Sequence, residues 1–192
     1  MYNLSKMQKT VKKYMDSNRY EHTLGVMYTA ASLAMRYEED MENAQVAGLL
    51  HDCAKCMPDS KKLKICKKAG IEITPTEEKN PYLLHGKVGA YLAAEKYGIE
   101  DEDILNAITW HTTGHGGMSR LEKIIYIADY IEPHRNKTPN LSDVRTLSFQ
   151  ELDLALFKIL SDTLAYLRKS ERSTDPMTVE AYEYYKKVML SQ

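Results

Sequence analysis

The sequence predicts an all-α fold in which helices pack as an array within one domain spanning residues 1–192. Glycine and proline are scarce, at nine and six residues in a chain of 192, and the alternating patterns typical of strands are almost absent. Apolar residues instead recur at helical spacing, as Leu152, Leu156, Ile159 and Leu160 do. An apolar content of 43% is enough for a chain of this length to fill a substantial core.

Apolar periodicity and capping residues together set the expected helices. Ser119 with Glu122 and Ser148 with Glu151 both fit the capping box, in which each side chain bonds a free amide of the other residue. The other boundary signals are Asp175–Pro176 at a helix start, and Gly70 and Gly98 at helix ends. The expected helices are 4–15, 18–37, 40–54, 60–69, 81–97, 101–111, 119–131, 148–169 and 176–190.

Two segments fall outside the regular pattern. Residues 132–147 hold two prolines and little helical periodicity, so we expect a long loop, a feature that is often functional. Residues 61–68 read KKLKICKK, which is typical of a solvated basic helix face rather than of a binding site.

Overall charge and cysteine content exclude several classes of protein. With 26 basic and 27 acidic residues the net charge is −1, so we expect no nucleic acid or membrane partner. No apolar run approaches the roughly 20 residues of a membrane span, and the first residues do not form a secretory signal. The three cysteines at 53, 56 and 66 do not make a disulfide framework, and we expect them to be structural rather than metal ligands. These features predict a cytoplasmic protein.

Histidines and aspartates carry the functional signal, because several of them fall on apolar helix faces. A single inward histidine is more often a hydrogen-bonded core residue than a ligand. Independent burial of so many polar groups is improbable, however, and a bare buried carboxylate such as that of Asp129 is costly. One central metal pocket explains them together. The side chains concerned are His22, His51, Asp52, His85, His111 and Asp129.

The adjacent pair His51–Asp52 ends the apolar run VAGLLHDCAK. Neighbouring residues on a helix diverge by about 100°, so both can bind one ion only near a helix end or from either side of a central axis, and we place the pair at a helix end. The small residues Ala47 and Gly48 are expected to leave room for that ion. The remaining histidines, His115 and His134, lie in expected loops and are interpreted as exposed residues without a ligand role.

Five separated blocks now support a resemblance to a known family: RYEHTLGV, GLLHDCAK, HGKVGAYLA, ITWHTTG and KIIYIADYIEPHR. In order and spacing they resemble the HD-domain superfamily of metallo-phosphohydrolases, and within it the symmetrical bis(5'-nucleosyl)-tetraphosphatases. The likeness covers residues 18–137 and extends weakly to 190. It departs from the family at Tyr182–Glu183, where Arg-Asn is expected, and this puts the contacts to the nucleoside in doubt.

The resemblance implies the roles of the site residues. The metal ligands are His22, His51, Asp52 and Asp129, with Asp52 also orienting the attacking water. His85 and His111 either hold a second metal ion or contact and protonate the phosphates, and the sequence leaves this choice open. Nitrogen and carboxylate ligands suit iron, manganese or zinc better than calcium or magnesium, and the resemblance favours iron.

The implied activity is hydrolysis of a dinucleoside polyphosphate, with diadenosine tetraphosphate cleaved symmetrically to two ADP. Such an anion needs local cations, because the net charge is close to zero. Alternatives are another HD-type nucleotide phosphodiesterase or phosphatase, or a nucleotide-sensing module without turnover. The only expected partner is a small nucleotide, and the chain is compatible with a homodimer. Expected substrate contacts are Arg19, Lys55, His85, His111, Thr112, Arg135, Lys137 and Arg172.

Overall fold

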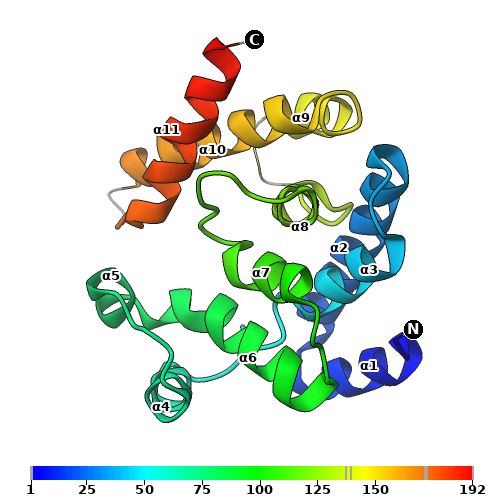
Figure 1. The fold of residues 1–192 in the computed structure, drawn as a ribbon, viewed down its shortest axis with the longest axis vertical. Helices are drawn as coiled ribbons and strands as arrows, with labels where there is room; N and C mark the ends of the chain where they lie inside the picture. The colour runs from blue at the N-terminus through cyan, green and yellow to red at the C-terminus, as the bar shows by residue number, and fades with distance from the viewer. Residues whose placement is uncertain (1, 137, 139, 171–172, 192) are drawn as a thin grey trace.

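The chain folds into helices joined by short connections (Figure 1). The computed structural model describes residues 2–136, 138, 140–170 and 173–191, and it contains no strand within these ranges, so the predicted all-α class is confirmed. The elements are α1 (Leu4–Val11), η1 (Lys12–Tyr14), α2 (Ser17–Tyr37), α3 (Met41–Leu50), α4 (Asp59–Ala69), α5 (Pro75–Lys79), η2 (Pro81–Leu84), α6 (His85–Tyr97), α7 (Glu102–Trp110), α8 (Arg120–Ile131), α9 (Leu141–Ser148), α10 (Leu152–Lys169) and α11 (Pro176–Leu190).

Helix α8 occupies the middle of this array. It packs against α2, α3 and α7 on one side and against α9 and α10 on the other (Figure 1). Its apolar residues Leu121, Ile124 and Ile125 are fully buried in the main core, which α2, α3 and α10 also line. A smaller apolar cluster around Leu84 and Val88 joins α4 to η2 and α6. The histidine-bearing segments therefore all pack near α8 or its neighbours.

Most of the expected boundaries are confirmed. Ser119 and Glu122 form the predicted capping box at the start of α8. The Asp175 side chain accepts a hydrogen bond from the Met177 amide at the start of α11. Gly70 and Gly98 end α4 and α6 with positive φ angles of 68°, a conformation that glycine adopts without a steric cost.

Two predictions about the segment after α8 are wrong. Helix α9 begins within the expected loop 132–147, because Leu141 and Val144 are one turn apart and are buried beside α8 and α10. The expected Ser148–Glu151 capping box does not form, since the Ser148 hydroxyl donates to the Val144 carbonyl instead. Helix α10 accordingly begins only at Leu152, without a side-chain cap.

The basic face of α4 is only partly solvated, which corrects the interpretation of residues 61–68. Lys62 is 2% exposed, and its Nζ lies 2.8 Å from the Oδ1 of Asp59. Cys66 is also buried. A short helix that the sequence reasoning missed, α5, follows α4 and carries a complete capping box formed by Thr74 and Glu77.

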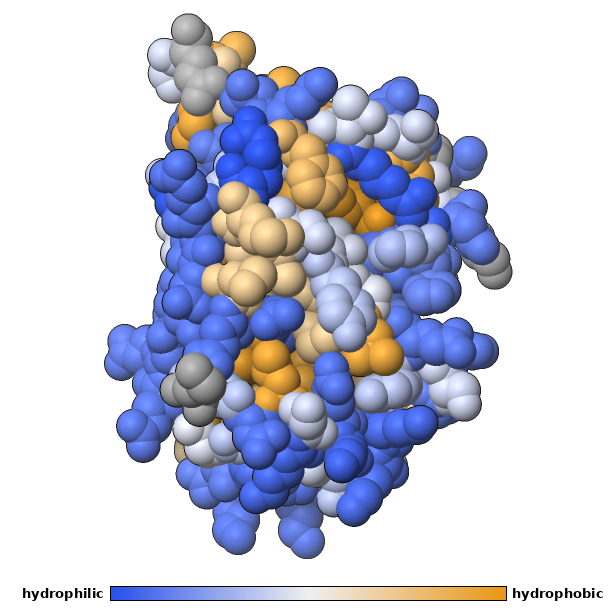
Figure 2. Space-filling view, turned by 90° about the vertical axis from the view of Figure 1, so that its right-hand side faces the viewer, coloured by the Kyte–Doolittle hydropathy of each residue, from blue (hydrophilic) through white to orange (hydrophobic). Residues whose placement is uncertain are grey.

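None of the described helices is long and apolar enough to cross a membrane. The side of the molecule shown in Figure 2 is mostly hydrophilic, with hydrophobic side chains gathered in patches between the polar ones.

Candidate metal centre

Three of the histidines lie where a helical segment ends. His51 follows α3, His85 follows η2 and His111 follows α7, each at the C-cap position. At a helix end most of the last carbonyl groups lack an intrahelical amide partner, and a carbonyl oxygen has two lone pairs, so a nearby imidazole can donate to one of them. Each Nδ1 lies 2.7 Å from the carbonyl oxygen three residues earlier, which belongs to Gly48, Tyr82 and Ile108 respectively. A carbonyl only accepts, so Nδ1 carries the proton and the Nε2 lone pair remains available as a ligand.

The His22 ring also has Nδ1 bonded and Nε2 free, but its partner is a side chain rather than a carbonyl group. It lies inside α2, and its Nδ1 is 3.0 Å from the Oε1 of Glu132, the residue at the C-cap of α8. This leaves the Nε2 of His22 facing Asp129, whose Oδ1 is 3.1 Å away. All four imidazoles therefore direct Nε2 into one region.

The first group of converging atoms comprises His22, His51, Asp129 and one oxygen of Asp52. The Nε2 of His51 lies 3.5 Å from the Oδ2 of Asp52 and 4.0 Å from the Oδ1 of Asp129. The Nε2 of His22 lies 3.9 Å from the Oδ2 of Asp52. Ligand atoms about 2.1 Å from a shared transition-metal ion are about 3 to 4 Å apart. The spacing of this group therefore fits a metal ion.

The second group uses the other oxygen of Asp52. Its Oδ1 lies 3.4 Å from the Nε2 of His85 and 3.5 Å from that of His111, and these two nitrogens are 3.1 Å apart. The Oγ1 of Thr112 is 3.0 Å and the Nζ of Lys55 is 3.1 Å from the same His85 nitrogen. Asp52 therefore lies between two clusters of metal-type atoms.

Unsatisfied polar atoms support a cation at this place. The Nε2 atoms of His22 and His51 and the Oδ1 of Asp52 are buried without a hydrogen-bond partner. Buried polar atoms are nearly always paired, and leaving several unpaired side by side is costly. A metal ion supplies the missing partner for nitrogen lone pairs and carboxylate oxygens together, so the residues present fit such an ion.

Electrostatics keep the ligands in the protonation states that metal binding needs. Burial favours the neutral form of Asp52, but the nearby His51, His111 and Lys55 side chains outweigh burial, so the pKa of Asp52 lies well below its usual value. Burial likewise opposes ionisation of Asp129, yet the adjacent His22 side chain and the charge of Arg135 lower its pKa. For His85, burial followed by Lys55 and His111 lowers the pKa well below 6.5. The carboxyls stay ionised and this imidazole stays neutral.

Several expected substrate contacts lie beside the two clusters. The Nη1 of Arg19 is 2.8 Å from the Oδ2 of Asp52, and the Nη2 of Arg135 bonds the Oδ1 of Asp129 at 2.6 Å. Lys55 and Thr112 adjoin His85, as described above. The other two expected contacts, Lys137 and Arg172, lie outside the described residues.

An open cleft of about 510 Å³ gives access to the His22 side of the centre. Its walls come from the start of α2 and from the segment that follows α8. A cleft with basic groups beside a metal site can admit an extended phosphate chain. The lining residues are Asp16, Asn18, Arg19, Glu21, His22, Glu132, His134 and Arg135.

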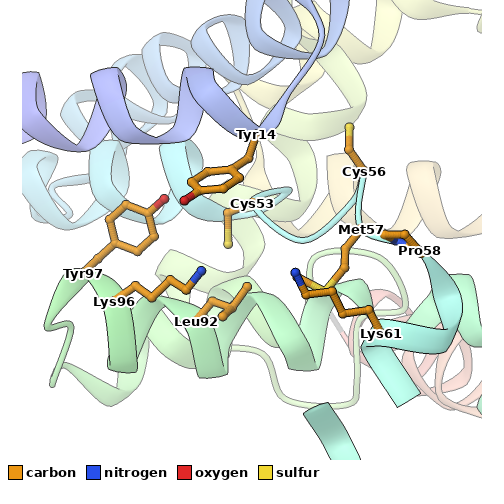
Figure 3. A pocket seen from close by; sticks show the side chains of 9 residues that line it. All are labelled: Tyr14, Cys53, Cys56, Met57, Pro58, Lys61, Leu92, Lys96 and Tyr97. Atoms are coloured by element: carbon orange, nitrogen blue, oxygen red, sulfur yellow. The ribbon is translucent and has the colours of Figure 1, made fainter. Parts of the chain in front are cut away.

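A second pocket, of about 190 Å³, holds none of the expected ligands (Figure 3). Cys53 points into it, whereas Cys56 points away, so the two thiols do not face each other. Burial, followed by the charge of Asp52, raises the pKa of Cys53 to about 12 and keeps this thiol neutral. The lining residues are Tyr14, Cys53, Cys56, Met57, Pro58, Lys61, Leu92, Lys96 and Tyr97.

Two expectations about this region need correction, those for Gly48 and His115. Gly48 does not leave space for an ion, because a Cβ there would lie 2.9 Å from the Cα of Met27, and the glycine instead allows α2 and α3 to approach closely. His115 is not a free surface residue, since its Nε2 is 2.8 Å from the Oε1 of buried Glu122. His134 is exposed as expected, but it lines the cleft and contacts Glu132.

Glu132 is the residue of this site that sequence reasoning missed. It is 1% exposed and bonds the proposed ligand His22. The available signal was its position immediately after the apolar face of α8 and immediately before Pro133, where a solvated loop was expected.

Comparison with known proteins places the chain in a family. The family model for the HD domain matches residues 19–134, which contain all six converging side chains. The chain belongs to the HD-domain family. A relative of this HD-domain protein from Bacillus subtilis (strain 168), named a symmetrical bis(5'-nucleosyl)-tetraphosphatase, is 41% identical over 91% of this chain and 92% of its own length.

Two further matches are similarly extensive. A protein of the same name from Staphylococcus aureus (strain NCTC 8325 / PS 47) is 34% identical over 95% of this HD-domain chain and 94% of its own. A crystal structure from Clostridium acetobutylicum, described as a predicted HD superfamily hydrolase involved in NAD metabolism, superposes with a TM-score of 0.94 at 42% identity. That match covers 98% of this chain and 99% of the Clostridium chain.

Proposed function

We propose that this protein is a metal-dependent phosphohydrolase that cleaves dinucleoside tetraphosphates symmetrically into two nucleoside diphosphates, and that residues 1–192 act as one domain. The observation that carries the proposal is the pair of clusters that share Asp52, each formed by buried Nε2 atoms and carboxylate oxygens. The names of the Bacillus and Staphylococcus relatives, which match this chain along almost its whole length, support the choice of substrate.

The proposed metal ligands are His22, His51, Asp52 and Asp129. A second ion would be held by His85, His111 and the other oxygen of Asp52. A bound ion supplies Lewis acidity, which activates water as a nucleophile and polarises a phosphoryl oxygen. Neutral imidazole and carboxylate ligands favour iron, manganese or zinc, and we propose iron as the native metal.

The remaining residues bind and orient the substrate. Arg19 and Arg135 face the cleft with guanidinium groups that can each take a phosphate through two hydrogen bonds. Asp52 accepts a hydrogen bond from the attacking water and so fixes the direction of its attack. These contacts bring a polyphosphate and a nucleophile together without a large positive surface.

The lowered pKa of His85 supports a ligand role for this residue over a role as proton donor. A general acid must carry a proton at the working pH, and burial keeps this imidazole neutral. His85 is therefore assigned as a ligand, and the donors to the leaving phosphate are the neighbouring Lys55 ammonium and Thr112 hydroxyl, both close to its Nε2.

Product analysis tests the proposal. Purified protein loaded with Fe²⁺, Mn²⁺ or Zn²⁺ is incubated with diadenosine tetraphosphate, and the nucleotides are separated by anion-exchange chromatography. ADP as the only product supports the proposal, whereas AMP together with ATP, or intact substrate, contradicts it. The His51→Ala variant serves as a control and should lose both bound metal and turnover.

A second candidate is hydrolysis of the pyrophosphate of NAD or a related dinucleotide. It is favoured by the description of the Clostridium protein as involved in NAD metabolism. Including NAD, cyclic nucleotides and phosphomonoesters in the same assay separates the candidates. Faster turnover of any of these than of the tetraphosphate would replace the proposed substrate.

The three cysteines are free thiols, which supports our proposal of a cytoplasmic location, where thiols are kept reduced.

A further inference from the structure

His22 differs from the other three histidines in how its ring is held. His51, His85 and His111 each donate Nδ1–H to a carbonyl at a helix end. His22 lies inside α2, where the carbonyls accept the amides of the following turn, and its ring is held by a side chain from elsewhere in the chain instead.

Glu132 supplies that side chain through a contact between residues 110 positions apart. Its Oε1 lies 3.0 Å from the Nδ1 of His22, and its side chain is 1% exposed. Its Oε2 accepts the backbone N–H of His134 at 2.7 Å and lies 3.2 Å from the Nδ1 of the same residue. Both carboxylate oxygens of Glu132 therefore act as acceptors. The Nδ1 atoms of His22 and His134 both face this carboxylate.

Contacts on two sides hold Glu132 in this place. Arg145 donates to the carbonyl oxygens of Ile131 and Glu132, each at 2.8 Å, and to that of Arg135 at 3.1 Å. On the other side, a Cβ at Gly25 would lie 2.4 Å from the Oε2 of Glu132. Helix α2 thus has a glycine where the carboxylate needs the space.

We propose that Glu132 is a positioning residue that links the metal centre to the substrate cleft. Through Oε1 it fixes the His22 tautomer in which Nε2 faces the metal. Through Oε2 it holds His134, whose side chain is 58% exposed and lines the cleft, so that this imidazole is kept in the cleft as a further substrate contact. The inference rests on the metal centre proposed above.

Carboxylates that accept from a ligating histidine typically strengthen metal binding 10- to 100-fold. The first test is calorimetric titration of chelator-treated protein with Mn²⁺. Glu132→Ala should weaken Mn²⁺ binding by about 10- to 100-fold. Glu132→Gln should weaken it less, because the neutral amide oxygen still accepts from His22, although more weakly than the carboxylate does. Wild-type Mn²⁺ affinity in both variants overturns the proposal.

The thermal unfolding midpoint of the metal-free variants separates positioning from a purely structural role. A structural role predicts a lower midpoint with unchanged affinity per folded molecule, and this outcome also overturns the proposal. Should Glu132→Ala not fold, the isosteric Glu132→Gln variant distinguishes the positioning role from the structural role. Long-range ¹H–¹⁵N NMR of its metal-free form should then show the Nδ1–H tautomer of His22 less populated than in the wild type. An unchanged tautomer in Glu132→Gln contradicts the inference.

His134→Ala tests the second half of the inference. It should leave Mn²⁺ affinity unchanged and raise KM for diadenosine tetraphosphate with little effect on kcat, and an unchanged KM overturns the link to the cleft. His51→Ala separates the two proposals. If this variant binds Mn²⁺ like the wild type, the proposed metal centre itself is wrong. If it loses Mn²⁺ while Glu132→Ala does not, the role of Glu132 alone is wrong.

Discussion

The Nη1 of Arg19 lies 2.8 Å from the Oδ2 of Asp52, the carboxylate that both metal-type clusters share. Arg19 is three residues before His22 on α2, so one helix presents a metal ligand and a cation to the same place. The Arg19 side chain remains 31% exposed. A phosphate entering the cleft would therefore meet a guanidinium that Asp52 already orients.

Replacing Arg19 by alanine should weaken substrate binding rather than metal binding. Loss of a charge-assisted contact to phosphate should lower kcat/KM for diadenosine tetraphosphate by about 10- to 100-fold. Steady-state kinetics and metal analysis of the same sample measure both effects. Arg36→Ala is the matched control, because Arg36 lies near the other end of α2 and bonds the carbonyl of Phe149. Equal losses in the two variants would show that Arg19 does not act through the cleft.

The stability of the metal-free protein should depend on pH through His85. Its pKa in the folded state lies well below 6.5, chiefly because it is buried. As pH falls below about 6.5, the unfolded chain binds a proton at His85 that the folded protein does not bind. The free energy of unfolding should therefore decrease by up to about 1.4 kcal/mol per pH unit, until the folded-state pKa is reached.

Urea unfolding of chelator-treated protein between about pH 7.5 and 5 measures this dependence. His85→Gln removes the titrating group, so its free energy of unfolding should fall less over the same range than that of the wild type. Parallel curves for the two proteins would contradict the assignment of His85 as a buried neutral imidazole.

Two glycines of α6 should respond differently to alanine, although they are only three residues apart. A Cβ at Gly86 would lie 2.4 Å from the carbonyl oxygen of Thr109, a backbone atom of α7, and should cost about 3 kcal/mol or more. At Gly89 the neighbour is the Cγ2 of Ile108 at 3.2 Å, a side-chain atom that can shift. The better helix propensity of alanine partly offsets that cost, by up to about 1 kcal/mol.

Urea midpoints of Gly86→Ala and Gly89→Ala compare these costs directly. Because α6 and α7 carry His85 and His111 next to this contact, Gly86→Ala should also disturb the second metal-type cluster. A Gly86 variant as stable as the Gly89 variant would contradict the close approach of the two helices.

The parts of the site that the sequence predicted depend on local signals. His51 and His111 end apolar helices, and a histidine at such an end can orient itself on the carbonyl three residues earlier. Asp52 follows directly, so its place near the ligand nitrogens is fixed by the same helix end. The capping box at Ser119 is likewise complete within four residues. The spacing of residues within one segment was therefore sufficient to predict the positions of these residues.

The parts that were missed depend on contacts between distant segments. Glu132 meets His22 only when α8 has packed against α2, and the sequence around Glu132 resembles a loop. Helix α9 was missed for a related reason. Its apolar residues Leu141 and Val144 are buried only by packing against α10 and α8. The nearby proline and polar residues favoured an irregular segment.

His115 offers a stability test that is independent of the metal. Its Nε2 bonds the Oε1 of Glu122, which is 6% exposed, while its ring lies against Trp110 with the ring centroids 5.2 Å apart. His115→Ala removes both contacts and leaves one oxygen of a buried carboxylate without its partner, so the free energy of unfolding should fall by about 1–3 kcal/mol. The Mn²⁺ affinity should stay at the wild-type value.

His115→Phe separates the two contributions, because phenylalanine keeps a ring against Trp110 but cannot bond Glu122. If the hydrogen bond dominates, the phenylalanine variant should be nearly as unstable as the alanine variant. The loop between α7 and α8 begins at the proposed ligand His111. His115 binds this loop to the first turn of α8 through Glu122. A phenylalanine variant with wild-type stability would show that ring packing alone holds this loop, and that Glu122 needs only its bond with the amide of Ser119.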